Sequence, residues 1–353
     1  MMRTITRFLP ILLLLLTAQL SAQDIHFSQF YSAPLLLNPA MTGNVSEHFR
    51  LTTTYRNQWS SIPAPYSTVA ASVDASLLGC QLGMDHVGVG GAVFSDRAGD
   101  GRLSNTSGLI SVAYHKGLDQ ERRYMLSGGV QAGFVNKSVD FSLLYFENQI
   151  GPDLEFDPTL PNNEPVENQS FNYFDLRFGG LFTASPNQNM NMYFGGSYYH
   201  PTKPGESFLK EELLEGDDNS LDARTVFHGG GSVFLNESFS VSPSILYMTQ
   251  TASNELIFGT AFGLHFNQGN RYRRGSSRDN SGLYLGAWYR WQDAIVFLLG
   301  VDYQSFRFGF SYDVNVSGLK EATLNQGAVE LSLSYTGRMA ECQKKTPTYC
   351  PRF

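Results

Sequence analysis

After its first 22 residues, the chain consists of short segments in which large apolar and polar side chains alternate. In one segment Phe306, Phe308 and Phe310 share one face of an extended chain. Arg307 and Asp313 lie on the opposite face, because successive side chains of a strand point to opposite sides. This period of two recurs along the chain and predicts β-strands with one apolar and one polar face.

Composition separates two folds that such alternation allows, a soluble β-sandwich and a transmembrane barrel. Only 16% of the residues are charged, and the chain holds 26 Phe and 18 Tyr. Large aromatics dominate the apolar faces, while arginine and aspartate occur well inside the strands. No later apolar run reaches the roughly 18 residues that a transmembrane helix needs. These features favour strands that face lipid, with the sandwich as the alternative.

The segments predict an all-β fold, a transmembrane outer-membrane β-barrel of about 14 antiparallel strands. An even number is usual for single-chain bacterial barrels. The strands are expected near residues 47–58, 66–77, 86–95, 103–115, 123–136, 170–183, 190–200, 223–235, 238–250, 255–267, 282–291, 293–303, 305–315 and 327–338.

Connection lengths predict the orientation of the barrel. If the first strand starts in the periplasm, the long links 137–169, 201–222 and 316–326 are extracellular. Links such as 184–189 are then short and periplasmic. We expect 201–222 to contact an exported client, because of its length and position.

One long link departs from this sorting. Residues 268–281 carry Arg271, Arg273, Arg274 and Arg278 and fall on the periplasmic side. A solvated basic turn is the favoured interpretation, and a docking surface for a periplasmic partner is the alternative.

The N-terminus predicts export. Arg3 and Arg7 precede a short apolar stretch, and cleavage before Gln23 would remove a signal peptide of residues 1–22. The formal charge of −7 then becomes −9, because two arginines and no acids are lost. This balance gives no support to nucleic-acid binding, which needs a basic face.

Three further parts follow the signal: residues 23–46, a barrel over 47–338, and a periplasmic tail over 339–353. Pro34, Pro39 and Gly43 disfavour a regular helix or strand in the first part, which we expect to be a periplasmic arm or a plug. Cys342 and Cys350 are close enough for a periplasmic disulfide that would leave Cys80 single, but spacing alone leaves their connectivity open.

No catalytic or metal-binding constellation stands out, and we expect neither cofactor nor enzymatic activity. The seven histidines never occur three or four residues apart, so no local zinc pair exists. The run Gly88–Gly91 lies inside a predicted strand with no helix after it, unlike a phosphate loop. Acidic clusters in the links match no calcium-loop spacing and are interpreted as solvated.

Charged residues on the polar faces of the strands are the candidate lumen and client contacts. Their mixed signs suggest a partly filled lumen that is cross-linked by pairs of opposite charges, because unpaired charges are costly away from water. An ordinary water-filled pore is the alternative. The set is Arg50, Arg56, Asp74, Asp175, Arg177, Arg290, Arg307 and Asp313.

The runs Gln23–Phe30 and Leu37–Gly43 are specific sequence motifs, and Tyr55–Trp59 and Glu330–Tyr335 extend them to both ends of the predicted barrel. On these motifs, nearly the whole chain after residue 22 resembles the PorP/SprF family of the type IX secretion system. The family-motif residues are Phe27, Ser28, Gln29, Asn38, Pro39, His200, Pro204, Tyr312 and Glu330. Where the family often has a histidine before this glutamate, the chain has Val329, so the resemblance assigns no role to that position.

The resemblance implies an outer-membrane barrel that helps to export and anchor surface adhesins by binding their C-terminal sorting domain. Some members support gliding motility. Implied partners are periplasmic components of the secretion system and a peptidoglycan-binding lipoprotein, besides outer-membrane lipid. A passive porin and a membrane lipase are the alternatives, although no Ser and His pair marks the latter.

Overall fold

The computed structural model describes residues 25–338, except 63–64, 80, 152, 154, 158, 162–163, 165–168, 209–219 and 267–280. The signal peptide, all three cysteines, the arginines of the 268–281 link and the tail therefore lie outside the described residues. Fourteen strands form the barrel: β1 (Phe49–Gln58), β2 (Tyr66–Leu77), β3 (His86–Ala98), β4 (Leu103–Gly117), β5 (Tyr124–Ser138), β6 (Ser170–Asn187), β7 (Met190–Tyr199), β8 (Arg224–Phe234), β9 (Phe239–Gln250), β10 (Ser253–His265), β11 (Ser281–Arg290), β12 (Ala294–Tyr303), β13 (Phe306–Asn315) and β14 (Gln326–Gly337).

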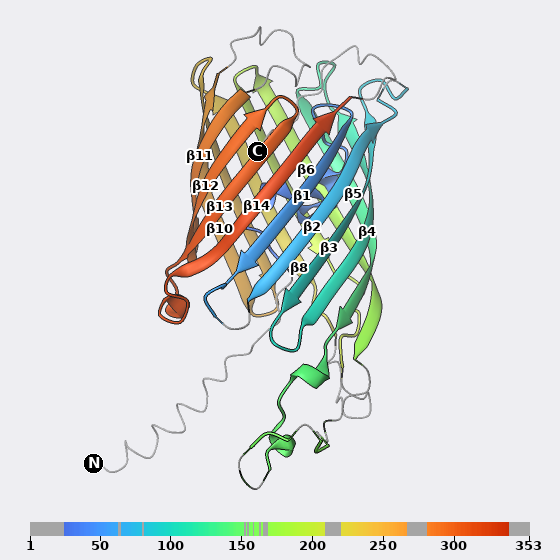
Figure 1. Cartoon of the computed structure of the whole chain (residues 1–353). Coiled ribbons are helices and arrows are strands. Elements are labelled where there is room, and N and C mark those ends of the chain that lie inside the picture. The colour runs from blue at the N-terminus through green and yellow to red at the C-terminus, as the bar shows by residue number, and fades with distance from the viewer. Residues whose placement is uncertain are drawn as a thin grey trace, which may run out of the picture.

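Each strand pairs antiparallel with its neighbours in the chain, and the sheet closes on itself (Figure 1). The closing pair is β1 with β14, in register from Phe49 opposite Gly337 to Gln58 opposite Ala328. Closure leaves no open sheet edge, as a lipid environment requires. The predicted barrel and its strand number are confirmed.

The apolar faces of the strands point outward. In β6, Phe174, Phe178 and Phe182 are exposed, whereas Asp175 and Arg177 between them are buried. The opposite arrangement, aromatics sealed between two sheets, would have indicated a sandwich. The outer surface is therefore the one that contacts lipid.

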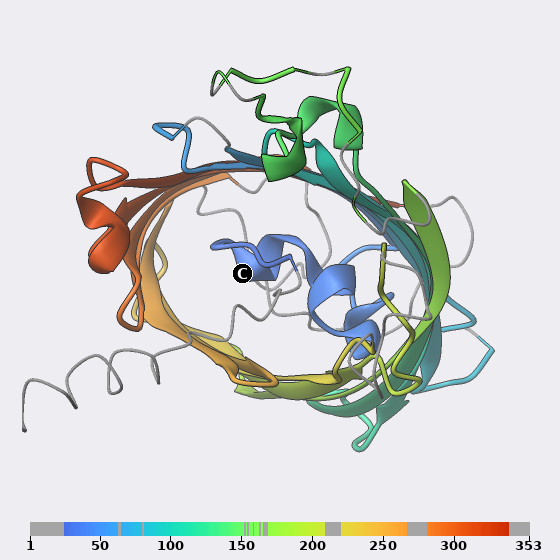
Figure 2. The ribbon, with the colours of Figure 1, turned by 90° about the horizontal axis from the view of Figure 1, so that it is seen from below.

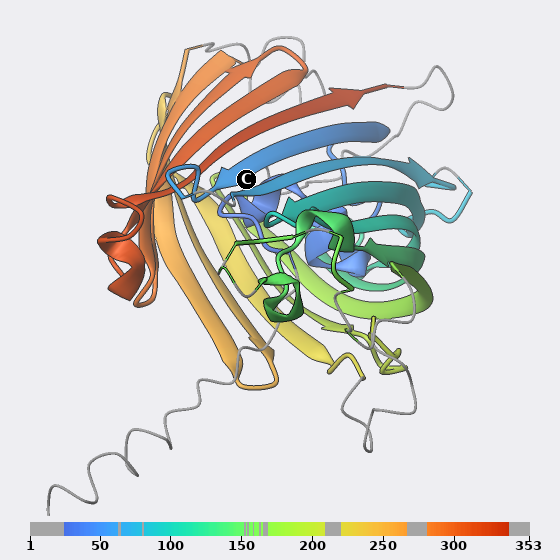
Figure 3. The same ribbon diagram turned by 60° about the horizontal axis from the view of Figure 1, so that its bottom comes forward.

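The barrel has two different rims. We call the end where odd-numbered strands finish the long-loop rim, because residues 139–169 and 201–222 connect strands there. Figure 3 shows the first of these connections, in green, projecting from that end. At the opposite end, the hairpin rim, β6 joins β7 and β12 joins β13 through only two residues each.

Residues 25–48, here called the lumen segment, lie inside the barrel (Figure 2, blue). The segment contains only short turns, η1 (Phe30–Ser32), α2 (Pro34–Leu37) and η2 (Pro39–Met41). Pro34 and Pro39 each start a turn, where the missing N–H costs nothing. None of the helices in the described part of the chain is long and apolar enough to cross a membrane.

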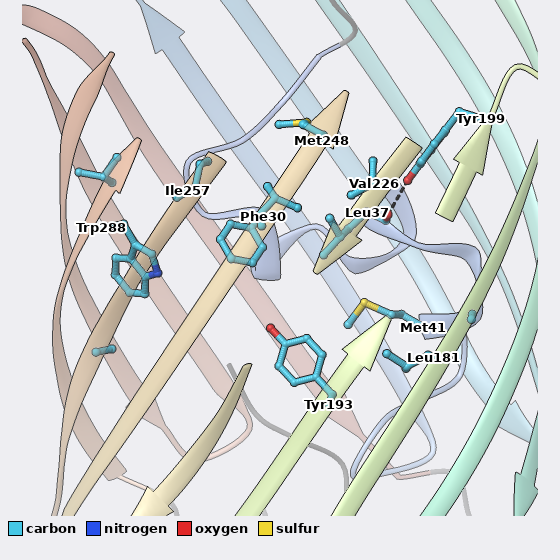
Figure 4. Close-up of a cluster of buried hydrophobic side chains, with 14 residues drawn as sticks. Phe30, Leu37, Met41, Leu181, Tyr193, Tyr199, Val226, Met248, Ile257 and Trp288 are labelled. Carbon is cyan, nitrogen blue, oxygen red and sulfur yellow. Dashed lines mark hydrogen bonds between the residues drawn. The ribbon is translucent and has the colours of Figure 1, made fainter. Parts of the chain in front are cut away.

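The buried core of the molecule lies between the lumen segment and the wall. Phe30, Leu37 and Met41 of the segment pack against wall side chains that include Tyr193 and Trp288 (Figure 4). A second cluster places Phe27, Ala33 and Leu35 against apolar residues of β2, β3 and β4, namely Ala70, Ala92, Phe94 and Leu109. The segment thus acts as the hydrophobic core that the barrel wall surrounds.

Candidate functional site: a lumen occupied by the N-terminal segment

The lumen segment crosses the barrel from rim to rim. At its start, the carbonyl oxygen of Ile25 accepts a hydrogen bond from Arg224, the first residue of β8 at the long-loop rim. Near its end, the N–H of Gly43 donates to Asp74 at 2.7 Å, close to the hairpin rim. The chain then enters β1, so the segment and the first strand run in opposite directions.

Wall glycines make room for the segment backbone. A Cβ on Gly129 would lie 2.4 Å from the carbonyl carbon of Pro39, and one on Gly179 would lie 1.9 Å from Oδ1 of Asn38. A Cβ on Gly88 would lie 1.9 Å from the carbonyl oxygen of Thr42. The Gly88–Gly91 run thus lies within a strand wall, as predicted, and its first glycine contacts the segment.

Asn38 is the most densely bonded residue of the segment and is fully buried. Its side-chain amide donates to the carbonyls of Gly180 and Gly196 at 3.0 and 3.2 Å and lies 2.9 Å from Nε2 of His228. Its Oδ1 accepts from the N–H of Ala40 at 2.8 Å and so caps η2. One side chain therefore joins the segment to three strands, β6, β7 and β8.

Wall side chains also bind the segment's main chain directly. His115 lies with Nε2 2.7 Å from the carbonyl oxygen of Thr42, and Gln131 donates to that of Leu35 at 3.1 Å. The Ser197 hydroxyl donates to a further carbonyl, that of residue 37, at 2.9 Å. These bonds satisfy backbone groups that an irregular segment would otherwise leave unpaired in a buried setting.

A buried charge cluster binds the start of the segment. The Glu330 carboxylate accepts the N–H groups of Ser28 and Gln29 at 2.6 and 2.9 Å. The Ser28 hydroxyl donates to Asp313 at 2.6 Å. Arg56 forms ion pairs with both carboxylates, and Arg290 forms one with Asp313. We define the charge cluster as Arg56, Arg290, Asp313 and Glu330, all at most 3% exposed.

His26 lies against this cluster, and its Nε2 is also 3.7 Å from a carboxylate oxygen of Glu255. Burial and the nearby guanidinium groups of Arg56, Arg290 and Arg224 lower the pKa of His26 well below its usual value. Arg290 donates to Nε2 of His26 at 3.1 Å, which requires that nitrogen to be unprotonated. Protonation of His26 would therefore remove this hydrogen bond and add a positive charge beside three arginines.

The other predicted lumen charges also face the interior, in three separate pairs. Asp175 accepts from Arg177 at 2.8 Å and lies 2.7 Å from Nδ1 of His200. Arg50 pairs with Asp74 at 2.9 Å, the carboxylate that also binds the segment.

The third pair is Arg307 with Asp302, 2.6 Å apart near the hairpin rim. Asp302 was not among the predicted candidates, although its parity in β12 placed it on the same face.

The remaining family-motif residues are divided between interior, rim and exterior. Phe27 is buried in the core inside the barrel. Pro204 lies in the β7–β8 connection, where its carbonyl oxygen accepts a hydrogen bond from the N–H of Leu221. Tyr312 lies on the outward-facing side of β13, like Phe310. Motif residues therefore do not form one site, but Ser28, Gln29, Asn38, Pro39 and Glu330 all serve the fit of segment to wall.

A model of the type IX secretion system membrane proteins PorP/SprF matches residues 19–335. The chain belongs to the PorP/SprF family. It is accordingly a type IX secretion protein of the outer membrane, as predicted. For this family member, the filled lumen is the main structural feature of the interior.

Solved structures with related shapes are outer-membrane barrels. The toluene transporter TbuX of Ralstonia pickettii is 13% identical, with a TM-score of 0.49, covering 87% of this chain and 94% of that one. A FadL homologue of Pseudomonas aeruginosa is 11% identical, with a TM-score of 0.46, covering 84% and 92%. No curated protein matches the chain.

Proposed function

We propose that this PorP/SprF protein is a non-enzymatic anchoring barrel that holds an exported adhesin by its C-terminal sorting domain. The observation that carries the proposal is the filled lumen. Four residues of the segment are fully buried inside the barrel, namely Leu35, Asn38, Ala40 and Thr42. The wall has glycines where a Cβ would clash with the segment's backbone. A pathway for a client would need this space, so the client binds at a rim and crosses the membrane elsewhere.

The two rims suit different partners. The long-loop rim faces the cell surface if the short hairpins face the periplasm, and it offers folded connections to an exported protein. On the hairpin rim we place the periplasmic components of the secretion system and the peptidoglycan-binding lipoprotein. A complex spanning both rims would link an adhesin to the cell wall, which is the arrangement that gliding motility needs.

Affinity purification from outer membranes solubilised in mild detergent tests the proposal. We expect a large adhesin with a C-terminal sorting domain to be recovered with the tagged barrel. Removal of the sorting domain from that adhesin should abolish recovery, whereas removal of another adhesin domain should not. A barrel that purifies alone from cells making the adhesin would contradict the proposal and favour a channel.

A porin would instead need a continuous water path. A cavity beside the segment holds about 90 Å³, room for several water molecules. It lies at the hairpin rim between Tyr31, Arg50 and Arg307. The buried segment and the small volume of this cavity support an anchoring role over conduction.

A further inference from the structure

The connection between β5 and β6 is a folded unit. Its turns η3 (Phe141–Leu143) and η4 (Glu147–Gln149) are followed by an antiparallel bridge between Ile150 and Phe156. Asp140 caps η3 by accepting the N–H of Ser142 at 3.1 Å. We call the described residues of 139–161 the β5–β6 ledge, which projects beyond the strand ends in Figure 1.

The inner side of the ledge is attached to the rim. The N–H of Asp140 donates to the carbonyl of Gly101 at 2.8 Å. Leu144 covers the same glycine, where a Cβ would lie 2.8 Å from its Cδ2. The Phe141 ring contacts that of Phe208 in the β7–β8 connection, with centroids 6.1 Å apart. These contacts hold the ledge in a defined position.

Several apolar side chains on the outer side of the ledge are exposed. Tyr145 is 78% exposed and Ile150 49%, and Leu143 and Phe156 are each 38% exposed. The rings of Tyr145 and Phe156 meet edge to face with centroids 4.4 Å apart. Ordered aromatic side chains left exposed together are typical of interaction surfaces.

Charge indicates what covers this surface. Residues 139–169 contain seven acids and neither Lys nor Arg. Among the described ones, Glu147, Asp153 and Glu155 are exposed around the apolar residues. An anionic membrane surface would repel such a patch, since membrane-surface segments are basic. A protein that presents an apolar patch among basic side chains would complement it.

We propose that the β5–β6 ledge docks the sorting domain of the exported adhesin, through an apolar patch on that domain surrounded by Lys and Arg. This inference rests on the proposed anchoring function and names its contact surface. The ledge contacts the β7–β8 connection through Phe208, which supports it from its inner side.

Binding of the isolated sorting domain to the purified full-length barrel tests the inference. The probe is the sorting domain of the adhesin recovered with the wild-type barrel, labelled and titrated in detergent. We expect Tyr145→Ala to weaken its Kd about tenfold or more, as removal of a central aromatic does. The triple variant Glu147→Lys, Asp153→Lys, Glu155→Lys should weaken it too and flatten its dependence on salt.

Two variants at the same rim, off the ledge, are matched controls. Leu324 is 70% exposed and Glu321 is exposed, both in the β13–β14 connection. Leu324→Ala and Glu321→Lys should bind as wild type, and heat-modifiable migration should show all variants folded. Wild-type affinity of Tyr145→Ala, or equal losses in the controls, would overturn the ledge as the docking surface. Failure of the wild-type barrel to bind any sorting domain would overturn the anchoring function itself.

Discussion

The Glu330 carboxylate on the last strand accepts the main-chain N–H of Ser28 at 2.6 Å, joining residues 302 positions apart. The same carboxylate pairs with Arg56 on the first strand. Glu330 thus contacts both sides of the barrel's closing seam and the segment that fills the lumen. One buried side chain therefore joins the closing seam of the wall to the segment.

Removal of Glu330 should be severely destabilising. In Glu330→Ala, Arg56 loses an ion pair in a buried site, and two N–H groups of the segment lose their acceptor. Breaking a buried ion pair from one side costs about 3 to 5 kcal/mol. The free energy of unfolding, measured by urea titration of the refolded barrel, should fall by this amount.

A double variant tests whether the loss of stability comes from the excess buried positive charge that Glu330→Ala leaves. Arg56→Met combined with Glu330→Met removes both charges and should recover part of the loss, because the buried cluster then keeps one arginine and one carboxylate, Arg290 and Asp313, and no excess positive charge. If Glu330→Ala unfolded at the wild-type urea concentration, the role assigned to the charge cluster would be wrong.

Glycine substitutions test the seating of the segment with neighbouring controls. Gly129→Ala and Gly179→Ala would place a Cβ against Pro39 and Asn38, whereas a Cβ on Gly128 or Gly180 would meet nothing within 4 Å. We expect the first two variants to lose about 1 to 3 kcal/mol of stability through overpacking. Gly128→Ala and Gly180→Ala should be close to wild type in the same thermal unfolding assay. Equal effects in all four would show that the segment does not lie against the wall.

Acid should weaken the seating of the segment through His26. Its pKa is lowered in the folded protein, by burial and by the three arginines, so the unfolded chain binds this proton more readily. Stability from neutral His26 is therefore fully present above about pH 6.5, the ordinary histidine pKa, and falls as pH drops below it.

The measurement is the urea midpoint between pH 8 and pH 5, in wild type and in His26→Gln, whose amide oxygen can still accept from Arg290. We expect the variant to lose less stability on acidification than wild type. Identical slopes for both proteins would show that His26 does not titrate in this range.

The strands could be predicted from sequence because their alternation is local. The outward position of Phe306 and the inward position of Asp313 follow from parity alone, whatever the neighbouring strand is. The path of residues 25–48 could not be predicted in the same way. Pro34 and Pro39 predicted irregular structure, but burial of Leu35 or Asn38 depends on contacts with strands more than 90 residues away.

The candidate site could also be predicted only in part from the sequence. Parity predicted that Arg56, Arg290 and Asp313 share the interior face, and they do meet in one cluster. The pairing of Arg56 with Glu330 depends on the register between the first and last strands, which no local pattern encodes. Asn38 carried no charge to mark it as a cross-strand contact, and only its place in the family motif singled it out.

Planar-bilayer conductance of the refolded barrel tests the filled lumen most directly. Wild-type protein should give no steady open-channel current, because residues 25–44 occupy the bore. A variant that lacks residues 25–44 and refolds to a heat-modifiable barrel should conduct steadily. Steady large currents from wild type, unchanged by the deletion, would contradict the account.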